Sequence, residues 1–199
     1  MDNKKLITGR LCLRRISTDD AAAMYELAKD PEVGPPAGWK PHESIEESTD
    51  IINSIFLTGD SFAVTDRETG VFMGVIAFEN DRYRPHANSR ELGYWLGRRY
   101  WGYGFMTEAA RAVIDYGFDV KGFDQIGICT SETNKRSQSV IKKCGFIYEG
   151  TIRRTYRIYD GSLRDSRVYS MTKAEWEARR AKNASAVKKS RVYEFAKIG

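Results

Sequence analysis

A turn with two glycines, residues 99–104 (Arg-Tyr-Trp-Gly-Tyr-Gly), joins a strand-like run to an amphipathic helix. The strand-like run covers 91–97, and apolar residues recur at helical spacing from 105 to about 118. A helix begins with four unpaired N–H groups and the positive end of its dipole, which together favour a bound phosphate. Glycine has no side chain to hold a phosphate away from those groups. The turn therefore indicates a strand–loop–helix site for a pyrophosphate, although two glycines could also serve only to tighten the turn.

The composition is that of an ordinary globular protein, with 41% hydrophobic and 30% charged residues in a chain of 199. This length is enough for one domain with a substantial core. There is no apolar run of membrane-spanning length, and the segment MDNKKLITGR lacks the apolar stretch of a signal peptide. We expect a cytoplasmic protein with no membrane partner. The three cysteines form no C-x-x-C pair, so neither a disulfide framework nor a metal site is expected.

The net charge of +5 is concentrated at the C-terminal end. Residues 179–199 carry seven basic side chains and one acidic one, a net +6, which leaves −1 for residues 1–178. We therefore expect a single domain over 1–178 and a basic tail over 179–199. Such a tail could contact nucleic acid, but a solvated extension is the favoured interpretation.

Hydrophobic periodicity predicts an alternation of strands and helices along the domain. The expected strands cover residues 6–15, 61–65, 71–78, 91–97, 125–130, a strand that begins at 146–148, and 166–171. The expected helices cover residues 17–28, 44–56, 105–118, 134–143 and 174–180. The turn at 66–70 joins two of the strands as a hairpin, and the strand at 91–97 completes a three-stranded meander.

A second motif follows the glycine turn at the start of the helix expected over 134–143. It reads Asn-Lys-Arg-Ser over 134–137, then Lys-Lys-Cys-Gly-Phe over 142–146 and Glu-Gly at 149–150. The two blocks together resemble the GNAT superfamily of acetyl-CoA-dependent N-acetyltransferases. The resemblance covers about residues 6–175, and its nearest branch is that of the ribosomal-protein N-terminal alanine/serine acetyltransferases. It implies an α+β GNAT fold, in which helices flank a mixed, mostly antiparallel sheet, and acetyl-CoA as co-substrate.

The resemblance also assigns residues to the cofactor. It implies that the third meander strand holds the pantetheine arm at Trp95, Leu96 and Gly97. It implies that the turn holds the pyrophosphate through Arg99, Gly102 and Gly104, with backbone help from Tyr103, Phe105 and Met106. On sequence grounds alone, Arg99 could equally be a surface cation.

Two polar residues of the second motif receive roles in the same way. The resemblance places Asn134 near the cofactor arm and gives Ser137 the task of steadying the departing thiolate. Both residues could also simply cap the helix that they begin. Many relatives carry a catalytic tyrosine in this helix, and here there is none.

The reaction implied is direct attack of an amine on the thioester carbonyl, which requires a base. Glu91 is the candidate, because strand alternation puts it on one face with Gly93 and Trp95, and acidic residues on this strand act through water in several relatives. The alternative is a solvent-facing strand residue. A second carboxylate reported in the branch has no clear match, and Tyr156 and Tyr159 occupy that region instead.

The acceptor is left open between two kinds of amine. A peptide α-amine has a pKa of about 8 and a lysine amine one of about 10.4, so a modest base favours a protein N-terminus, of the ribosomal-protein type, or a low-pKa small amine. A polyamine, amino acid or antibiotic is the alternative, and a non-catalytic acyl-CoA-binding or RNA-particle-associated module is a third hypothesis. The first two helices and the 34–43 loop with Trp39 should select the acceptor. His42 and His86 are expected at the surface, and an exposed edge strand could pair two copies.

Overall fold

The computed structural model describes residues 5–57, 59–85, 88–186 and 194–196. The strands are β1 (Lys5–Ile7), β2 (Leu11–Arg15), β3 (Asp60–Asp66), β4 (Phe72–Asn80), β5 (Ser89–Leu96), β6 (Gln125–Thr130), β7 (Ile147–Arg157), β8 (Leu163–Thr172) and β9 (Glu194–Ala196). The α-helices are α1 (Ala21–Ala28), α2 (Ile45–Ile51), α3 (Phe105–Asp119), α4 (Lys135–Cys144) and α5 (Lys173–Ala186). The expected α+β class is confirmed.

The strands form one mixed sheet in the order β7-β8-β6-β5-β4-β3-β2-β1-β9. Every neighbouring pair is antiparallel except β5 and β6, which run parallel. The parallel pair requires a crossover connection, which α3 supplies, because parallel strands cannot be joined by a tight turn. The expected meander is β3-β4-β5, and the site described below lies at its junction with β6.

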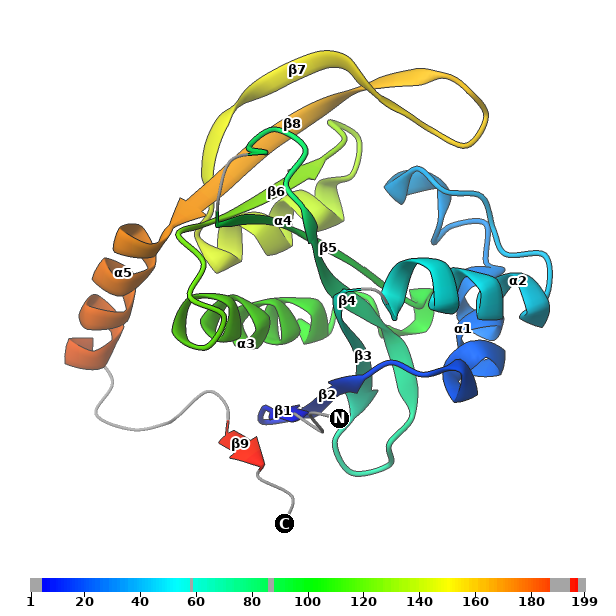
Figure 1. Cartoon of the computed structure of the whole chain (residues 1–199), viewed down its shortest axis with the longest axis horizontal. Coiled ribbons are helices and arrows are strands. Elements are labelled where there is room, and N and C mark those ends of the chain that lie inside the picture. The colour runs from blue at the N-terminus through cyan, green and yellow to red at the C-terminus, as the bar shows by residue number, and fades with distance from the viewer. Residues whose placement is uncertain (1–4, 58, 86–87, 187–193, 197–199) are drawn as a thin grey trace.

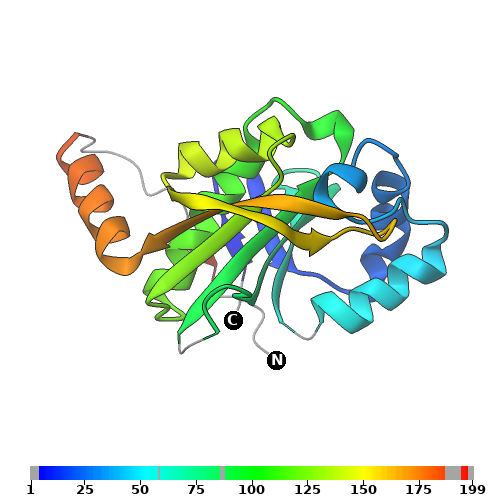
Figure 2. The same ribbon diagram turned by 90° about the horizontal axis from the view of Figure 1, so that it is seen from above.

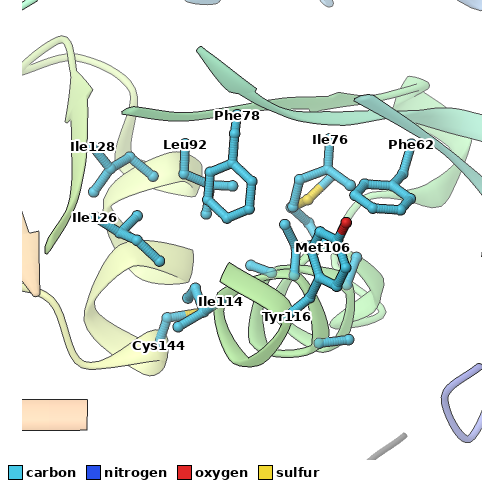
Figure 3. Close-up of a cluster of buried hydrophobic side chains, with 14 of the residues drawn as sticks. Phe62, Ile76, Phe78, Leu92, Met106, Ile114, Tyr116, Ile126, Ile128 and Cys144 are labelled. Carbon is cyan, nitrogen blue, oxygen red and sulfur yellow. The ribbon is translucent and has the colours of Figure 1, made fainter. Parts of the chain in front are cut away.

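Helices cover both faces of the sheet (Figures 1 and 2). Helices α3 and α4 lie on one face, and the larger buried cluster forms between them and the sheet, with Phe78, Ile76 and Ile126 among its members (Figure 3). Helices α1 and α2 lie on the other face, over a smaller cluster that includes Met24 and Val75. The alternation of side chains along β4 and β5 therefore sends successive residues to different layers.

Two expected elements differ from the structure at their ends. The strand expected over 6–15 is divided into β1 and β2 by a tight turn, in which the Thr8 N–H donates to the Leu11 carbonyl at 2.9 Å. The terminal helix expected over 174–180 extends to Ala186. Arg179 donates to the carbonyl of Cys144 at 2.5 Å, and Arg180 pairs with Asp119 at 2.6 Å, so the start of the basic segment packs on the domain. Much of the remaining tail lies outside the described residues.

Within the described residues, no helix is both long enough and apolar enough to cross a membrane.

Candidate active site

The parallel strands β5 and β6 separate part-way along their length. They pair only from Ser89 to Glu91 on β5 and from Gln125 to Gly127 on β6, although β5 continues to Leu96 and β6 to Thr130. Beyond Glu91, the backbone of β5 that faces β6 therefore has no strand partner, while its other side stays paired with β4. A cavity of about 680 Å³ lies at this opening and is lined by residues of both strands. Unpaired backbone groups beside a cavity can hydrogen-bond an extended ligand.

The glycine turn lies at one end of this cavity with its amides uncovered. Gly102 and Gly104 both adopt left-handed backbone angles, with φ of 84° and 81°, and Gly104 is the residue that precedes α3. No atom lies within 4 Å of the position that a Cβ would take at Gly102, and the nearest at Gly104 is Arg10 Nη2 at 3.7 Å. The indole of Trp101 donates to the Leu96 carbonyl at 2.8 Å and fixes the turn to the end of β5. The start of α3 is thus open to a phosphate.

Nine of the twelve residues predicted for the site line the cavity. They are Glu91, Trp95, Leu96, Gly102, Gly104, Phe105, Met106, Asn134 and Ser137. Gly97, Arg99 and Tyr103 are not among the lining residues.

Each of these three residues has other surroundings. A Cβ at Gly97 would lie 2.7 Å from Leu27 Cδ2, so this glycine allows α1 to approach the strand. The Arg99 guanidinium is exposed and lies 5.0 Å from the ring of Tyr100. Tyr103 is 66% exposed. Their contribution to cofactor binding stays a prediction.

Helix α4 contributes two cations to the cavity wall. Arg136 and Lys143 both line the cavity, and the Arg136 guanidinium lies 3.9 Å from the ring centre of Trp101 in the glycine turn. The sequence places Arg136 inside the second motif, but its spacing alone does not show which face of the helix meets the turn. Arg136 thus supplies positive charge beside the turn that precedes α3, where the dipole also favours an anion, and Lys143 adds a second cation to the cavity lining.

The two polar residues of the second motif meet a tyrosine from β5. The Ser137 N–H donates to Asn134 Oδ1 at 3.0 Å, so Asn134 does cap α4. Ser137 Oγ lies 3.2 Å from the hydroxyl of Tyr94, which reaches it from the adjacent strand. Burial raises the pKa of Tyr94 above its usual value, opposed by its hydrogen bond with Ser137. A tyrosine is therefore present beside Ser137, although α4 itself contains none.

Glu91 lies at the point where β5 and β6 part. It is 6% exposed, which excludes the solvent-facing alternative. Its Oε2 accepts from Arg82 Nε at 2.9 Å, and its Oε1 accepts from the Cys129 thiol at 3.0 Å. Burial, with the nearby charge of Glu91, raises the pKa of Cys129 to about 12, so this cysteine is a neutral thiol at physiological pH.

Aromatic residues line the cavity on the side of α1 and α2. Trp39 packs against Trp95 and His42, with ring centres 5.7 and 5.3 Å apart. His42 is only 8% exposed, and its Nδ1 lies 2.8 Å from Ser48 Oγ. The prediction of a surface position is therefore wrong for His42, because this loop folds inward over the smaller core cluster; burial lowers the pKa of the imidazole. His86 lies outside the described residues.

The tip of the β7–β8 hairpin reaches the loop before α2, where the Tyr159 N–H donates to the Gly38 carbonyl at 3.1 Å. Arg164 of β8 donates from Nη1 to the Pro36 carbonyl at 3.0 Å and from Nη2 to the Ala37 carbonyl at 2.9 Å. The ring of Tyr156 lies 4.7 Å from the Arg164 guanidinium and 4.9 Å from that of Arg82. Two segments distant in sequence thus form a single wall.

Comparison with known proteins places this geometry in a family. The family model of the acetyltransferase (GNAT) domain matches residues 10–147. An uncharacterized N-acetyltransferase of Bacillus licheniformis, p20, is 32% identical over 177 residues, covering 86% of this chain and 97% of the relative. The ribosomal protein uS5-alanine N-acetyltransferase of Escherichia coli is 27% identical over 187 residues, covering 86% and 92%.

Solved structures share the fold. Spermidine N-acetyltransferase from Vibrio cholerae, solved in complex with CoA and spermine, matches with a TM-score of 0.71 at 20% identity and covers 84% of this chain and 98% of that one. The glycine turn before α3, the parting of β5 from β6 and the family match agree with one another. This chain belongs to the GNAT family of N-acetyltransferases.

Proposed function

We propose that this enzyme transfers the acetyl group of acetyl-CoA to the α-amine of a protein N-terminus, by direct attack of the amine within a ternary complex. The observation that carries the proposal is the cavity at the parting of β5 and β6. It has open amides at the start of α3 and, where the strands part, acidic side chains. A thioester held across this opening can be reached by an amine from the side of α1 and α2.

Acetyl-CoA fits the described residues. The amides at Gly102 and Gly104 receive the pyrophosphate, and Arg136 and Lys143 add positive charge beside it. The unpaired backbone of β5 from Leu92 to Leu96 is a hydrogen-bonding edge for the amide groups of the pantetheine arm. The Ser137 hydroxyl, with Tyr94 behind it, is placed to steady a thiolate. In this proposal the base is a carboxylate at the parting of β5 and β6, where the sequence predicts Glu91.

The proposed acceptor class rests on the basicity of amines and on relatives that act on a ribosomal protein or on a polyamine. A protein α-amine loses its proton more easily than a lysine or polyamine amine, which suits a site with carboxylates as its base. Among the relatives, one acts on the alanine of ribosomal protein uS5 and one on spermidine. A small-molecule amine is therefore the alternative acceptor. We place the reaction in the cytoplasm and propose that β7, an edge strand of the sheet, could pair with a second copy.

Acetyl-CoA is expected to raise the melting temperature of the protein. A ligand that binds only the folded state stabilises it by about 2.7 kcal/mol at a concentration of one hundred times Kd. For a chain of this size, this stabilisation corresponds to an increase of about 5–10 °C. Differential scanning calorimetry with and without acetyl-CoA measures the change in melting temperature, with AMP as the nucleotide control. An unchanged melting temperature at saturating acetyl-CoA would contradict every function that uses this cofactor.

Acceptor choice is tested by thiol release from acetyl-CoA. The panel contains peptides that begin with Ala, Ser or Thr, the same peptides with a blocked N-terminus, spermidine and an aminoglycoside. Turnover with the free peptides alone supports the proposed function. Turnover with spermidine or the aminoglycoside alone supports the small-molecule alternative, and no turnover with any amine supports a non-catalytic module.

Removal of residues 187–199 is expected to leave acetyl transfer unchanged. The cut follows the end of α5, so Arg179 and Arg180 keep their contacts with Cys144 and Asp119. We expect kcat/KM for an Ala-initiated peptide to stay within about threefold of the full chain. A loss above about tenfold, which is about 1.4 kcal/mol in the barrier, would make the tail part of the site.

A further inference from the structure

Two carboxylates face each other across the β4–β5 pair. Glu79 of β4 and Glu91 of β5 are register partners, and both line the cavity. They continue a row of cross-strand pairs, Val75 with Trp95 and Ala77 with Gly93, on the face covered by α1 and α2. Like charges directly opposite one another destabilise a sheet. This arrangement therefore has a cost in stability, and the two side chains differ in what offsets it.

Glu91 is held in place on both oxygens. Arg82 donates to one oxygen and the Cys129 thiol to the other, and the Glu91 side chain is only 8% exposed. A general base needs an accessible oxygen within hydrogen-bond reach of the amine. Removing a proton from the amine with Glu91 would also disturb its ion pair with Arg82. Glu91 is therefore better suited to fix Arg82 and Cys129 than to exchange protons.

The Glu79 carboxylate, unlike that of Glu91, is not held by hydrogen bonds or by an ion pair within the part of the chain that the structure describes. Its side chain makes no hydrogen bond or ion pair with another described residue and is exposed to the cavity. Its Oε1 lies 3.4 Å from the position that a Cβ would take at Gly93, so the carboxylate leans along β5 toward the unpaired part of the strand. The absence of a side chain at Gly93 leaves room for it. The Glu79 carboxylate therefore points toward the region where the thioester would lie.

The surroundings of Glu79 also favour proton uptake. Enclosure by the cavity wall, together with the negative charge of Glu91, raises the pKa of Glu79, and Arg82 opposes the increase. A base with a raised pKa binds a proton more strongly near neutral pH. The other ionisable groups that line the cavity on this side are Arg82, Cys129, Tyr156 and Arg164, with Lys40 and His42 from the loop before α2 and Glu47 from α2.

We propose that Glu79 accepts the proton of the attacking amine and that Glu91 is a positioning residue that holds Arg82 and Cys129. This inference rests on the proposed function. As the N–C bond forms, one amine proton passes to a carboxylate oxygen of Glu79 and leaves from there to solvent. The C–S bond then breaks with its electron pair on sulfur. The Ser137 hydroxyl donates a hydrogen bond to the thiolate, which then takes its proton from solvent.

The test compares Glu79→Gln and Glu91→Gln with Glu68→Gln, a control in the exposed β3–β4 turn. The acceptor is an Ala-initiated peptide, or spermidine if the panel selects it, and kcat/KM is measured from pH 5 to 9. Glu79→Gln should lower kcat/KM by about 100-fold or more and leave Kd for acetyl-CoA unchanged. Glu91→Gln should keep more activity and move the acidic limb of the profile to lower pH, because a negative charge beside Glu79 is lost. Glu68→Gln should match the wild type.

The outcomes distinguish a failure of the proposed function from a failure of the inference about Glu79. A wild-type enzyme without turnover on any amine overturns the proposed function, and this inference with it. If the wild type is active and Glu79→Gln stays within threefold of it, only the inference fails. A loss confined to Glu91→Gln, with acetyl-CoA still bound, would make Glu91 the base. Thermal unfolding of each variant confirms that the fold is retained.

Discussion

Gly104→Glu is expected to abolish acetyl-CoA binding, with Kd raised at least about 100-fold, or about 2.8 kcal/mol. Gly104 precedes the first turn of α3, and the space beside it is open. A carboxylate introduced there would be attracted by the helix dipole and by the same N–H groups that a phosphate would use. It would therefore occupy the phosphate site and repel the cofactor at the same time. Isothermal titration calorimetry with acetyl-CoA measures the change.

A matched substitution isolates that effect from backbone strain. Gly104 has φ of 81°, which is unfavourable for a residue with a side chain by about 1–2 kcal/mol. Gly70, in the turn between β3 and β4, has φ of 72° and no atom within 4 Å of its Cβ position. Gly70→Glu should lose similar stability and keep Kd for acetyl-CoA. If Gly104→Glu binds as tightly as Gly70→Glu, the phosphates do not lie on the α3 amides.

The elements of the fold could be predicted because their hydrophobic periods are local. Strand β6 matches the expected residues 125–130, and α3 exceeds the expected 105–118 by one residue. The hairpin turn at 66–70 was predicted from its polar residues and Gly70, and Asp66 Oδ1 accepts from the Thr69 N–H at 2.8 Å within it. The glycine turn is predicted from its Arg-x-x-Gly-x-Gly pattern between a strand and a helix. In each case the information lies within a few residues of the element.

The site residues that the sequence does not predict depend on strand register and on helix orientation. Glu79 follows directly on the strand expected over 71–78, and nothing in the spacing shows that it faces Glu91, because that pairing is set by the meander as a whole. Tyr94 meets Ser137 only when β5 and α4 pack together. The glycine motif pointed to Arg99 as the cation, whereas Arg136 and Lys143 line the cavity. The identity of the base could not follow from alternation, which gives the face of a residue and not its partners.

Phe78→Ala is expected to lower the free energy of unfolding by about 3–5 kcal/mol, a large share of the stability of a domain. Phe78, labelled in Figure 3, is 5% exposed. Its ring packs edge-on against Phe123, with ring centres 5.0 Å apart. A Cβ at Gly117 of α3 would lie 2.8 Å from Phe78 Cζ, so the ring fills the space that this glycine leaves. Its removal would leave a cavity between the sheet and α3. Urea unfolding followed by circular dichroism measures the loss, with Tyr159→Ala, 51% exposed, as control.

A double-mutant cycle between Phe78 and Gly117 tests the packing of the ring on α3. Gly117→Ala alone should destabilise the protein by about 1–3 kcal/mol, because overlap with the buried ring outweighs the gain of about 1 kcal/mol in helix propensity. In the Phe78→Ala background the shortest of these contacts is gone, while Ile126 Cδ1 at 3.0 Å and Phe123 Cδ2 at 3.1 Å remain, so the same change should cost less stability. The two changes should therefore couple by about 1–3 kcal/mol. Additive effects would mean that the Phe78 ring does not pack on α3. Because Phe78 faces α3 while Glu79 faces the other layer, the folded Phe78→Ala variant should keep its kcat/KM.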